Sequence, residues 1–210
     1  MIISAYNEGM NGTPENRKEK RVLFLFWLFF AGSEIVKQIL LTSSKGFYDV
    51  WYFPFQLCSM PIYLLPFALL LPEEKGRGIR GFLADYSLLG GIMVFLDQSG
   101  LHYDLPILTI HSYLWHILLI VLGLYMRRKK IRSSFWEETK IFLLLVLIAE
   151  FINFLFKGMT NMFYVSLWMP MGQIVFRDIA VYTGNTVSIL LYVFSIILGA
   201  FLLHKTGQSS

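Results

Sequence analysis

The sequence contains a single cysteine, Cys58, so no disulfide can form within the chain and cysteine usage does not reveal a redox compartment. Charged residues are also scarce, at 15% of the chain, against about 25% in soluble domains. The sequence has no glycine-rich phosphate loop, no internal repeat and no low-complexity tract. These absences argue against a P-loop enzyme, a repeat protein and a disulfide-stabilised domain.

Apolar residues dominate instead. Hydrophobic residues make up 56% and aromatic residues 17% of the 210 residues, and the mean hydropathy is +0.58. Several apolar runs approach the ~20 residues that a helix needs to cross a bilayer. They are too long for barrel strands and do not alternate with a period of two. The sequence predicts an all-α, multi-pass membrane protein with six transmembrane helices in a bundle, at 21–41, 53–71, 82–98, 106–126, 139–157 and 185–204.

The basic residues indicate which side of the membrane each connection faces. The net charge is +4. Three connections hold most of the lysines and arginines: Arg17, Lys18, Lys20 and Arg21; Lys75, Arg77 and Arg80; Arg127, Arg128, Lys129, Lys130, Arg132 and Lys140. The alternate connections carry only Lys45 and Arg177. Because cytoplasmic loops hold the excess of lysine and arginine, we expect both termini in the cytoplasm and a place in the cell membrane. This topology accounts for the basic residues without a nucleic-acid partner.

The predicted topology divides the chain into three parts. A polar cytoplasmic lead (1–20) precedes the transmembrane domain (21–204), and a short cytoplasmic tail (205–210) follows it. The long connection 158–184 is rich in aromatic residues and methionine. We expect it on the outer face, either as an interfacial aromatic belt or as a lid over a site.

Polar side chains inside the predicted spans need an explanation, because a charge at the bilayer centre costs roughly 2.5–3.5 kcal/mol on insertion scales. Two sets each share one helix face: Glu34, Lys37 and Gln38, and Glu150, Asn153 and Lys157. The polar residues expected in the outer half are Glu34, Gln56, Cys58, Asp97, His111, Glu150 and Asn153, with His116 near the midplane. Their common depth predicts a site. The alternative is that Glu34–Lys37 and Glu150–Lys157 are ion pairs near helix ends.

Cys58 is the candidate nucleophile. A thiol becomes reactive where a histidine or a positive charge favours the thiolate, and His116 is the candidate general base. Pro54 and Pro61 flank the cysteine, and a proline within a span kinks the helix and frees backbone carbonyls, which would open a cavity. The alternative is that Cys58 is a packed, inert residue, as buried cysteines often are.

The histidine spacing argues against a metal site. His111 and His116 are five positions apart, which sets them about 140° apart around a helix, unlike the i, i+4 pair of a zinc-binding helix. His102 would have to join them from an outer loop. We therefore expect no metal and no cofactor.

Short motifs in these segments resemble a known family. They are Pro54-Phe55-Gln56-Leu57-Cys58, the aromatic-rich stretch ending in His116, and Asn153-x4-Gly158-x2-Asn161-Met162-x-Tyr164 with Pro170. Over about residues 20–204 the chain resembles the YwaF-like bacterial integral membrane proteins, relatives of the animal transmembrane protein 164 family. The resemblance implies a six-helix membrane fold shared with the androgen-induced-gene-type lipid hydrolases. A Thr-Pro-Asp-like element expected after the third span is replaced by Asp97-Gln98-Ser99-Gly100.

The resemblance also implies a chemistry, since the animal relative is described as a cysteine-dependent acyltransferase acting on ether phospholipids. Carried over, Cys58 would accept the acyl group and His116 would be its general base. Residues expected to support the substrate or an oxyanion are Gln56, Asn153, Asn161, Glu150 and Glu34. The first hypothesis is therefore acyl transfer or acyl hydrolysis on membrane phospholipids, in an outward-facing cavity.

Two other functions fit the same sequence. A carrier for a small solute or ion would use Glu34, Lys37, Asp97 and Glu150. It predicts polar groups that continue into the inner halves of the spans, which are expected to be nearly all apolar. The other is a membrane scaffold without enzymatic activity.

Overall fold

The computed structural model describes residues 14–129 and 133–208, and no β-strand occurs among them. The α-helices in this part of the chain are α2 (Pro14–Lys45), α3 (Met60–Leu70), α4 (Glu73–Met93), α5 (Pro106–Arg127), α6 (Phe135–Leu155), α7 (Ile174–Thr183) and α8 (Asn185–Gln208). Short 3-10 turns lie at Val50–Tyr52, Leu57–Ser59, Gln98–Gly100 and Met162–Tyr164. The predicted all-α fold is confirmed.

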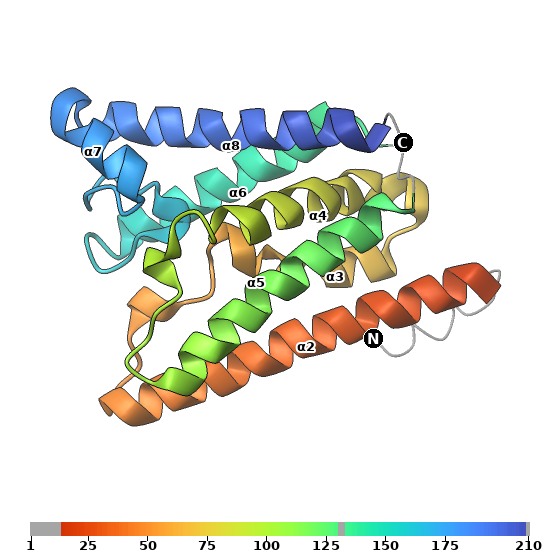
Figure 1. The fold of residues 1–210 in the computed structure, drawn as a ribbon, viewed down its shortest axis with the longest axis horizontal. Helices are drawn as coiled ribbons and strands as arrows, with labels where there is room; N and C mark the ends of the chain where they lie inside the picture. The colour runs from red at the N-terminus through yellow and green to blue at the C-terminus, as the bar shows by residue number, and fades with distance from the viewer. Residues whose placement is uncertain (1–13, 130–132, 209–210) are drawn as a thin grey trace.

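The long helices run roughly along one direction and alternate in sense (Figure 1). α2 begins and α8 ends at one end of the bundle, which we call the basic end because the start of α4 and the end of α5 there also carry lysines and arginines. α7 and the loops that precede α5 and follow α6 gather at the other end, the loop end (Figure 1). This arrangement matches the alternation expected from the basic residues. That the basic end faces the cytoplasm stays a prediction.

Three helices are long and apolar enough to cross a membrane: Glu15–Lys45, Pro106–Arg127 and Asn185–Gly207. They contain the predicted spans 21–41, 106–126 and 185–204. Large apolar side chains stand exposed on the helices, among them Leu25, Leu144 and Phe194, and soluble monomers rarely expose contiguous apolar surface on this scale. The chain is therefore a membrane protein. The other three predicted spans correspond to α3, α4 and α6, so crossing by all six elements stays a prediction.

The second predicted span is only partly helical. The prediction placed a helix over 53–71, but α3 begins at Met60 and contains 11 residues, or about 16 Å at 1.5 Å per residue. Pro61 lies in its first turn, where the missing N–H is not needed and the fixed φ favours a helix start. Cys58 consequently lies in the turn Leu57–Ser59, immediately before the helix.

Other boundaries also differ from the prediction. α4 begins at Glu73 rather than at 82 and ends at Met93 rather than at 98. α2 begins at Pro14, so the part of the predicted lead that the structure describes is helical. Glu15 in the first turn and Lys45 in the last turn of α2 complement the helix dipole. Polar residues at these ends therefore extend the helices beyond their apolar runs.

α4 lies against α5 at two glycines. A Cβ on Gly91 would lie 3.0 Å from the carbonyl oxygen of His116, and one on Gly123 would lie 2.9 Å from that of Ala84. Small residues allow such close approach of helices in membranes. This contact fixes the height of His116 relative to α4.

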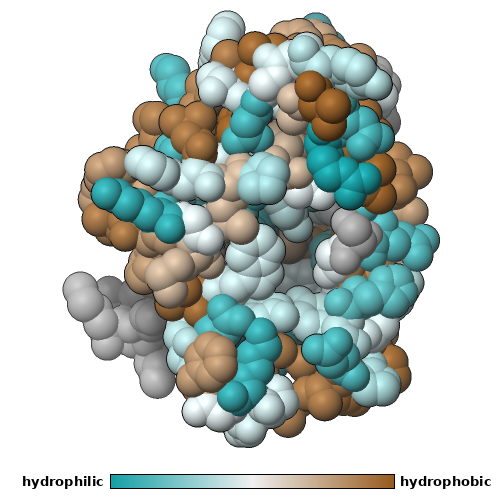
Figure 2. Space-filling model, turned by 90° about the vertical axis from the view of Figure 1, so that its left-hand side faces the viewer, coloured by the Kyte–Doolittle hydropathy of each residue, from teal (hydrophilic) through white to brown (hydrophobic). Residues whose placement is uncertain are grey.

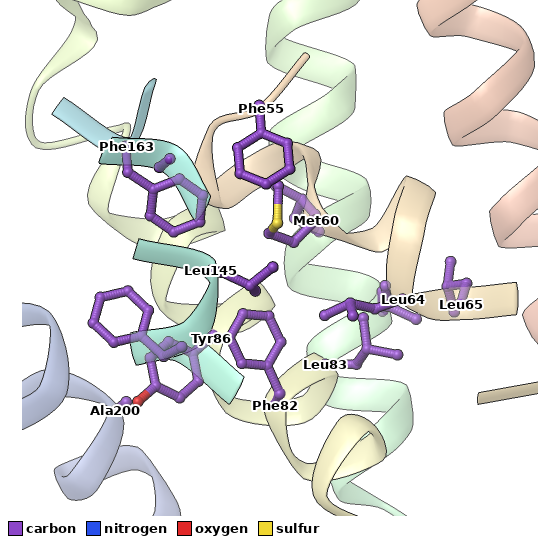
Figure 3. Close-up of a cluster of buried hydrophobic side chains, with 14 of the residues drawn as sticks. Phe55, Met60, Leu64, Leu65, Phe82, Leu83, Tyr86, Leu145, Phe163 and Ala200 are labelled. Carbon is purple, nitrogen blue, oxygen red and sulfur yellow. The ribbon is translucent and has the colours of Figure 1, made fainter. Parts of the chain in front are cut away.

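A chain of aromatic rings connects α4 to the segment before Cys58. Phe82 stacks on Tyr86 with ring centroids 4.6 Å apart, and Tyr86 stacks on Phe142 at 5.1 Å. Phe163 continues the chain, 6.2 Å from Phe142 and 5.9 Å from Phe55. Figure 3 shows Phe55 and Phe163 facing the same cluster as Met60 and Leu145. The core therefore positions the segment 53–59 from the side of α6.

Candidate functional site

Cys58 lies beside α5. The indole Nε1 of Trp115 donates a hydrogen bond to the carbonyl oxygen of Cys58, 3.1 Å away. The thiol is free and partly buried. A bond between positions 57 residues apart joins the turn that carries the thiol to the middle of α5.

His116 follows Trp115 in α5 and is buried. Its Nδ1 lies 2.7 Å from the carbonyl oxygen of Ser112, and since a carbonyl can only accept, Nδ1 carries the proton. Nε2 of the neutral ring is then the nitrogen with the lone pair. Among the described residues no hydrogen bond joins His116 to Cys58. The structure thus places the two predicted catalytic residues on neighbouring elements. The backbone of Cys58 is hydrogen-bonded to Trp115, the residue next to His116.

His111 was given no catalytic role in the sequence-based prediction. Both of its ring nitrogens are buried, and neither has a hydrogen-bond partner in the described part of the chain. Its ring centroid lies 5.4 Å from that of Trp115. Buried polar groups without partners are uncommon and call for a ligand, a water or a catalytic role. The sequence showed His111 one helical turn before Trp115, but it could not show that Trp115 contacts Cys58.

The predicted polar face of α2 is confirmed as an ion pair. Lys37 Nζ lies 2.8 Å from Glu34 Oε1, and Gln38 Nε2 donates to Glu34 Oε1 at 2.6 Å and to the carbonyl oxygen of Tyr52 at 2.7 Å. The charges of Glu34 and Lys37 act on both Cys58 and His111. α2 therefore brings one carboxylate and one ammonium group to the same site.

A groove of about 340 Å³ runs between α2 and the segment that carries Cys58. Its lining residues are Ala31, Glu34, Ile35, Gln38, Ile39, Pro54 and Ile62. Pro54 and Ile62 lie four residues before and four residues after Cys58. The exposed surface of the groove is thus almost entirely apolar.

Asn153 and Asn161 hold the loop after α6. The side-chain oxygen of Asn153 accepts from the backbone N of Met162 at 2.7 Å and from Thr160 Oγ1 at 3.1 Å, and its Nδ2 donates to the carbonyl oxygen of Met162 at 3.1 Å. Asn161 Oδ1 accepts from the backbone N of Ser166 at 3.1 Å. The side-chain amides of Asn153 and Asn161 therefore both make hydrogen bonds within this loop.

The same loop meets the Cys58 segment through Gln56, whose Nε2 donates to the carbonyl oxygen of Asn161 at 2.9 Å. Gln56 Oε1 is buried and has no partner in the described part of the chain. Phe163 and Tyr164 have φ of 54° and 57°, a strained backbone for aromatic residues. The hydrogen bonds of Asn153 and Asn161 offset that strain, which is found preferentially at functional sites.

Glu150 contacts these residues through Asn153. Its Oε2 is 3.4 Å from Asn153 Nδ2, and no ion pair with Lys157 occurs in the described ranges. Lys157 Nζ lies instead over the rings of Phe154 and Trp168, at 5.7 and 5.5 Å from their centroids. The alternative prediction of a Glu150–Lys157 pair is wrong, because aromatic rings attract the ammonium group.

Two carboxylates at the loop end, Asp97 and Asp49, accept hydrogen bonds that hold the loops there. Asp97, in the segment that departs from the expected motif, accepts a hydrogen bond from the backbone N of Ile174 at 3.1 Å and so stabilises the first turn of α7. The loop before Val50 carries Asp49, whose pKa is lowered by its hydrogen bond from Lys45 and by that from the backbone N of Trp51. Figure 2 shows the loop end, where hydrophilic and weakly polar side chains surround a recess near the centre and hydrophobic ones lie on the flanks.

The model of the TMEM164 family matches residues 5–205. The chain belongs to the TMEM164 family. No curated protein and no solved structure matches it. The predicted relation to transmembrane protein 164 is thus confirmed, while the YwaF-like bacterial label stays a prediction. TMEM164 membership and the apolar helices agree that this is a membrane protein.

Proposed function

We propose that this TMEM164 family member is a membrane-embedded enzyme that transfers or hydrolyses acyl groups of phospholipids with Cys58 as its nucleophile. One observation carries the proposal: the backbone carbonyl of Cys58, the only cysteine of the chain, accepts a hydrogen bond from Trp115 in the part of α5 that bears His111 and His116. A thiol and an imidazole on adjacent elements are the two groups that covalent acyl transfer needs.

His116 is the general base in this proposal. With Nδ1 donating to Ser112, its Nε2 is able to accept a proton. Catalytic hydrogen bonds often tighten only when substrate is bound, so the absence of a direct bond to Cys58 is compatible with this role. Lys37 supplies positive charge where negative charge develops on the sulfur and on the carbonyl oxygen.

The reaction follows from these groups. Nε2 takes the proton of the thiol, and Sγ attacks the carbonyl carbon of an acyl ester. The ester C–O bond breaks, the leaving alkoxide takes the proton from His116, and the acyl group remains on Cys58 as a thioester. A lipid hydroxyl or a water then attacks the thioester and passes its proton through His116 to sulfur, which completes acyl transfer or hydrolysis.

The groove lined by Pro54 and Ile62, on either side of Cys58 in the sequence, has the size and polarity expected for the lipid substrate. Its volume of about 340 Å³ lies in the range of ligand sites, and its apolar walls suit an acyl chain. Glu34 and Gln38 are among the residues that line it. We assign Asn153 and Asn161 to positioning the loop that supports Gln56, because their amides are occupied.

The single cysteine makes the decisive experiment simple. Purified protein is incubated with a phospholipid that carries an alkyne-tagged acyl chain, and the covalent label on the protein is measured with acyl transfer to an added lysophospholipid. We expect a label that hydroxylamine removes, and we expect both label and transfer to be lost in Cys58→Ala. Undiminished acyl transfer by Cys58→Ala would rule out a mechanism with Cys58 as the nucleophile. Appearance of free fatty acid without transfer identifies hydrolysis.

A further inference from the structure

We propose that Asp85, Glu138 and His204 form a binding site for a divalent transition-metal ion near the basic end of the bundle. The three residues come from α4, α6 and α8 and are all buried. His204 Nδ1 lies 3.1 Å from Asp85 Oδ2 and 3.1 Å from Glu138 Oε1, and the three ligand atoms lie within 4.8 Å of one another. This site is separate from Cys58 and does not depend on acyl chemistry.

The ligand types and spacing suit zinc or a similar ion. Imidazole nitrogen and carboxylate oxygen are both zinc ligands, and zinc sites that keep an open position use three protein ligands. Atoms that share a metal at ~2.0–2.2 Å stand about 3 to 3.6 Å apart, and the two measured separations from His204 fall in this range. A single imidazole N–H shared between two buried carboxylates explains the same distances less well, because each acceptor then receives half a hydrogen bond.

An unpartnered oxygen supports a bound cation independently. Glu138 has no exposed surface, and its Oε2 has no hydrogen-bond partner in the described part of the chain. Its Oε1 faces His204, so the whole carboxylate points into the cluster. A carboxyl oxygen buried without a hydrogen-bond partner is costly, and a metal ion bound by this group would satisfy it.

The surrounding groups orient the ligands. Arg127 Nη1 lies 3.4 Å from Asp85 Oδ1, which leaves Oδ2 for His204 and the metal. Ser133 Oγ donates to Glu138 Oε1 at 2.5 Å. Such outer partners of carboxylate ligands are typical of metal sites.

α4 makes room for this cluster with a glycine. A Cβ on Gly81 would collide with Ser133 Oγ and Glu138 Oε1, so no larger residue lets α6 bring Glu138 to this depth. From the sequence, only His102, His111 and His116 were possible metal ligands. The inner halves of the predicted spans were expected to be nearly all apolar. That expectation is wrong, since the cluster unites positions 85, 138 and 204, which no local spacing connects.

Zinc binding by the full chain tests the site. Protein purified in detergent through a histidine-free tag is stripped with a chelator, reloaded with Zn²⁺ and passed through a desalting column. Metal content and the midpoint of thermal unfolding are then measured. We expect about one retained zinc ion per chain and a midpoint that rises with zinc concentration, since a ligand of the folded state stabilises it.

His204→Gln and Glu138→Gln should lose both the retained zinc and the zinc-dependent rise, whereas the matched His102→Gln should keep both. The proposal is overturned if the wild-type chain retains no zinc above a metal-free buffer, or if His204→Gln retains as much as His102→Gln. The wild-type measurement decides the matter even where a variant does not fold. Neither result depends on acyl transfer, so failure here and failure of the proposed function are distinguishable.

Discussion

The indole of Trp115 donates a hydrogen bond to the backbone carbonyl of Cys58 across 3.1 Å. Trp115 also contacts the ring of His111 and directly precedes His116 in α5, so one side chain joins the backbone of Cys58 to the part of α5 that carries both imidazoles. The geometry of the candidate site therefore depends on this bond, which can be removed without removing any candidate catalytic group.

Trp115→Phe keeps an aromatic ring but removes the donor. We expect a loss of about 1–3 kcal/mol of stability, because the carbonyl of Cys58 is left unsatisfied, and faster alkylation of Cys58 by a maleimide. Thermal unfolding and the alkylation rate measure the two effects. Trp136→Phe, at an indole that is 69% exposed, is the matched control and should change neither. Equal alkylation rates in the two variants would contradict the role given to Trp115.

His111 and His116 are distinguished by a pair of isosteric variants. If His116 Nε2 is the base, His116→Gln should lower acyl transfer by about 10²-fold or more, and His111→Gln should have a smaller effect. The measurement is the rate of thioester formation on Cys58 in each variant, with His102→Gln as control. A larger loss in His111→Gln would move the role of base to the histidine whose nitrogens have no partner.

Two neighbouring glycines give a test of helix packing. A Cβ on Gly91 would lie 2.8 Å from Ile120 Cγ1, whereas one on Gly90 would meet nothing closer than 3.8 Å. Gly91→Ala should therefore separate α4 from α5 and destabilise the fold by roughly 1–3 kcal/mol, while Gly90→Ala should be neutral or slightly stabilising. Thermal unfolding in detergent compares the pair. Similar midpoints for both variants would show that the two helices pack differently.

Asn153 offers a test of the loop that supports Gln56. Asn153→Ala removes the partners of the Met162 backbone and of Thr160 in a fully buried place, so a loss of about 2–4 kcal/mol is expected. Thr160→Val, which removes one of those bonds, should cost about 1 kcal/mol. Unfolding midpoints give the ranking. The reverse order would show that Asn153 does not hold this loop.

Much of the fold follows from hydropathy alone. The spans 21–41, 106–126 and 185–204 lie within α2, α5 and α8 because long apolar runs leave a chain few alternatives in a membrane. The start of α3 was less predictable. Pro61 is a recognisable helix-start signal, but the apolar run through Phe53–Leu57 favoured a longer helix. The turn at Leu57–Ser59 depends on bonds from Trp115 and Gln56, which are tertiary.

The candidate site was predictable in its types of residue and less so in their roles. Helix spacing placed Glu34 and Lys37 on one face of α2, where they form the ion pair that was the alternative prediction. The family resemblance gave Asn153 and Asn161 an expected part in supporting the substrate or an oxyanion, whereas in the structure their amides hold a backbone loop. Asp85 and Glu138 were missed because each was judged within its own segment, and their proximity arises only when α4, α6 and α8 pack together.

The length of α3 has a consequence for the lipid around the protein. Its 11 residues cover about 16 Å, roughly half of the ~30 Å hydrocarbon thickness. A bilayer adapts to a short hydrophobic element by thinning beside it. Thinning next to α3 would lower the glycerol esters of the outer leaflet toward the turn before Met60. Hydrophobic mismatch, rather than a wide opening in the protein, would then be what brings an interfacial ester within reach of a deeply placed sulfur.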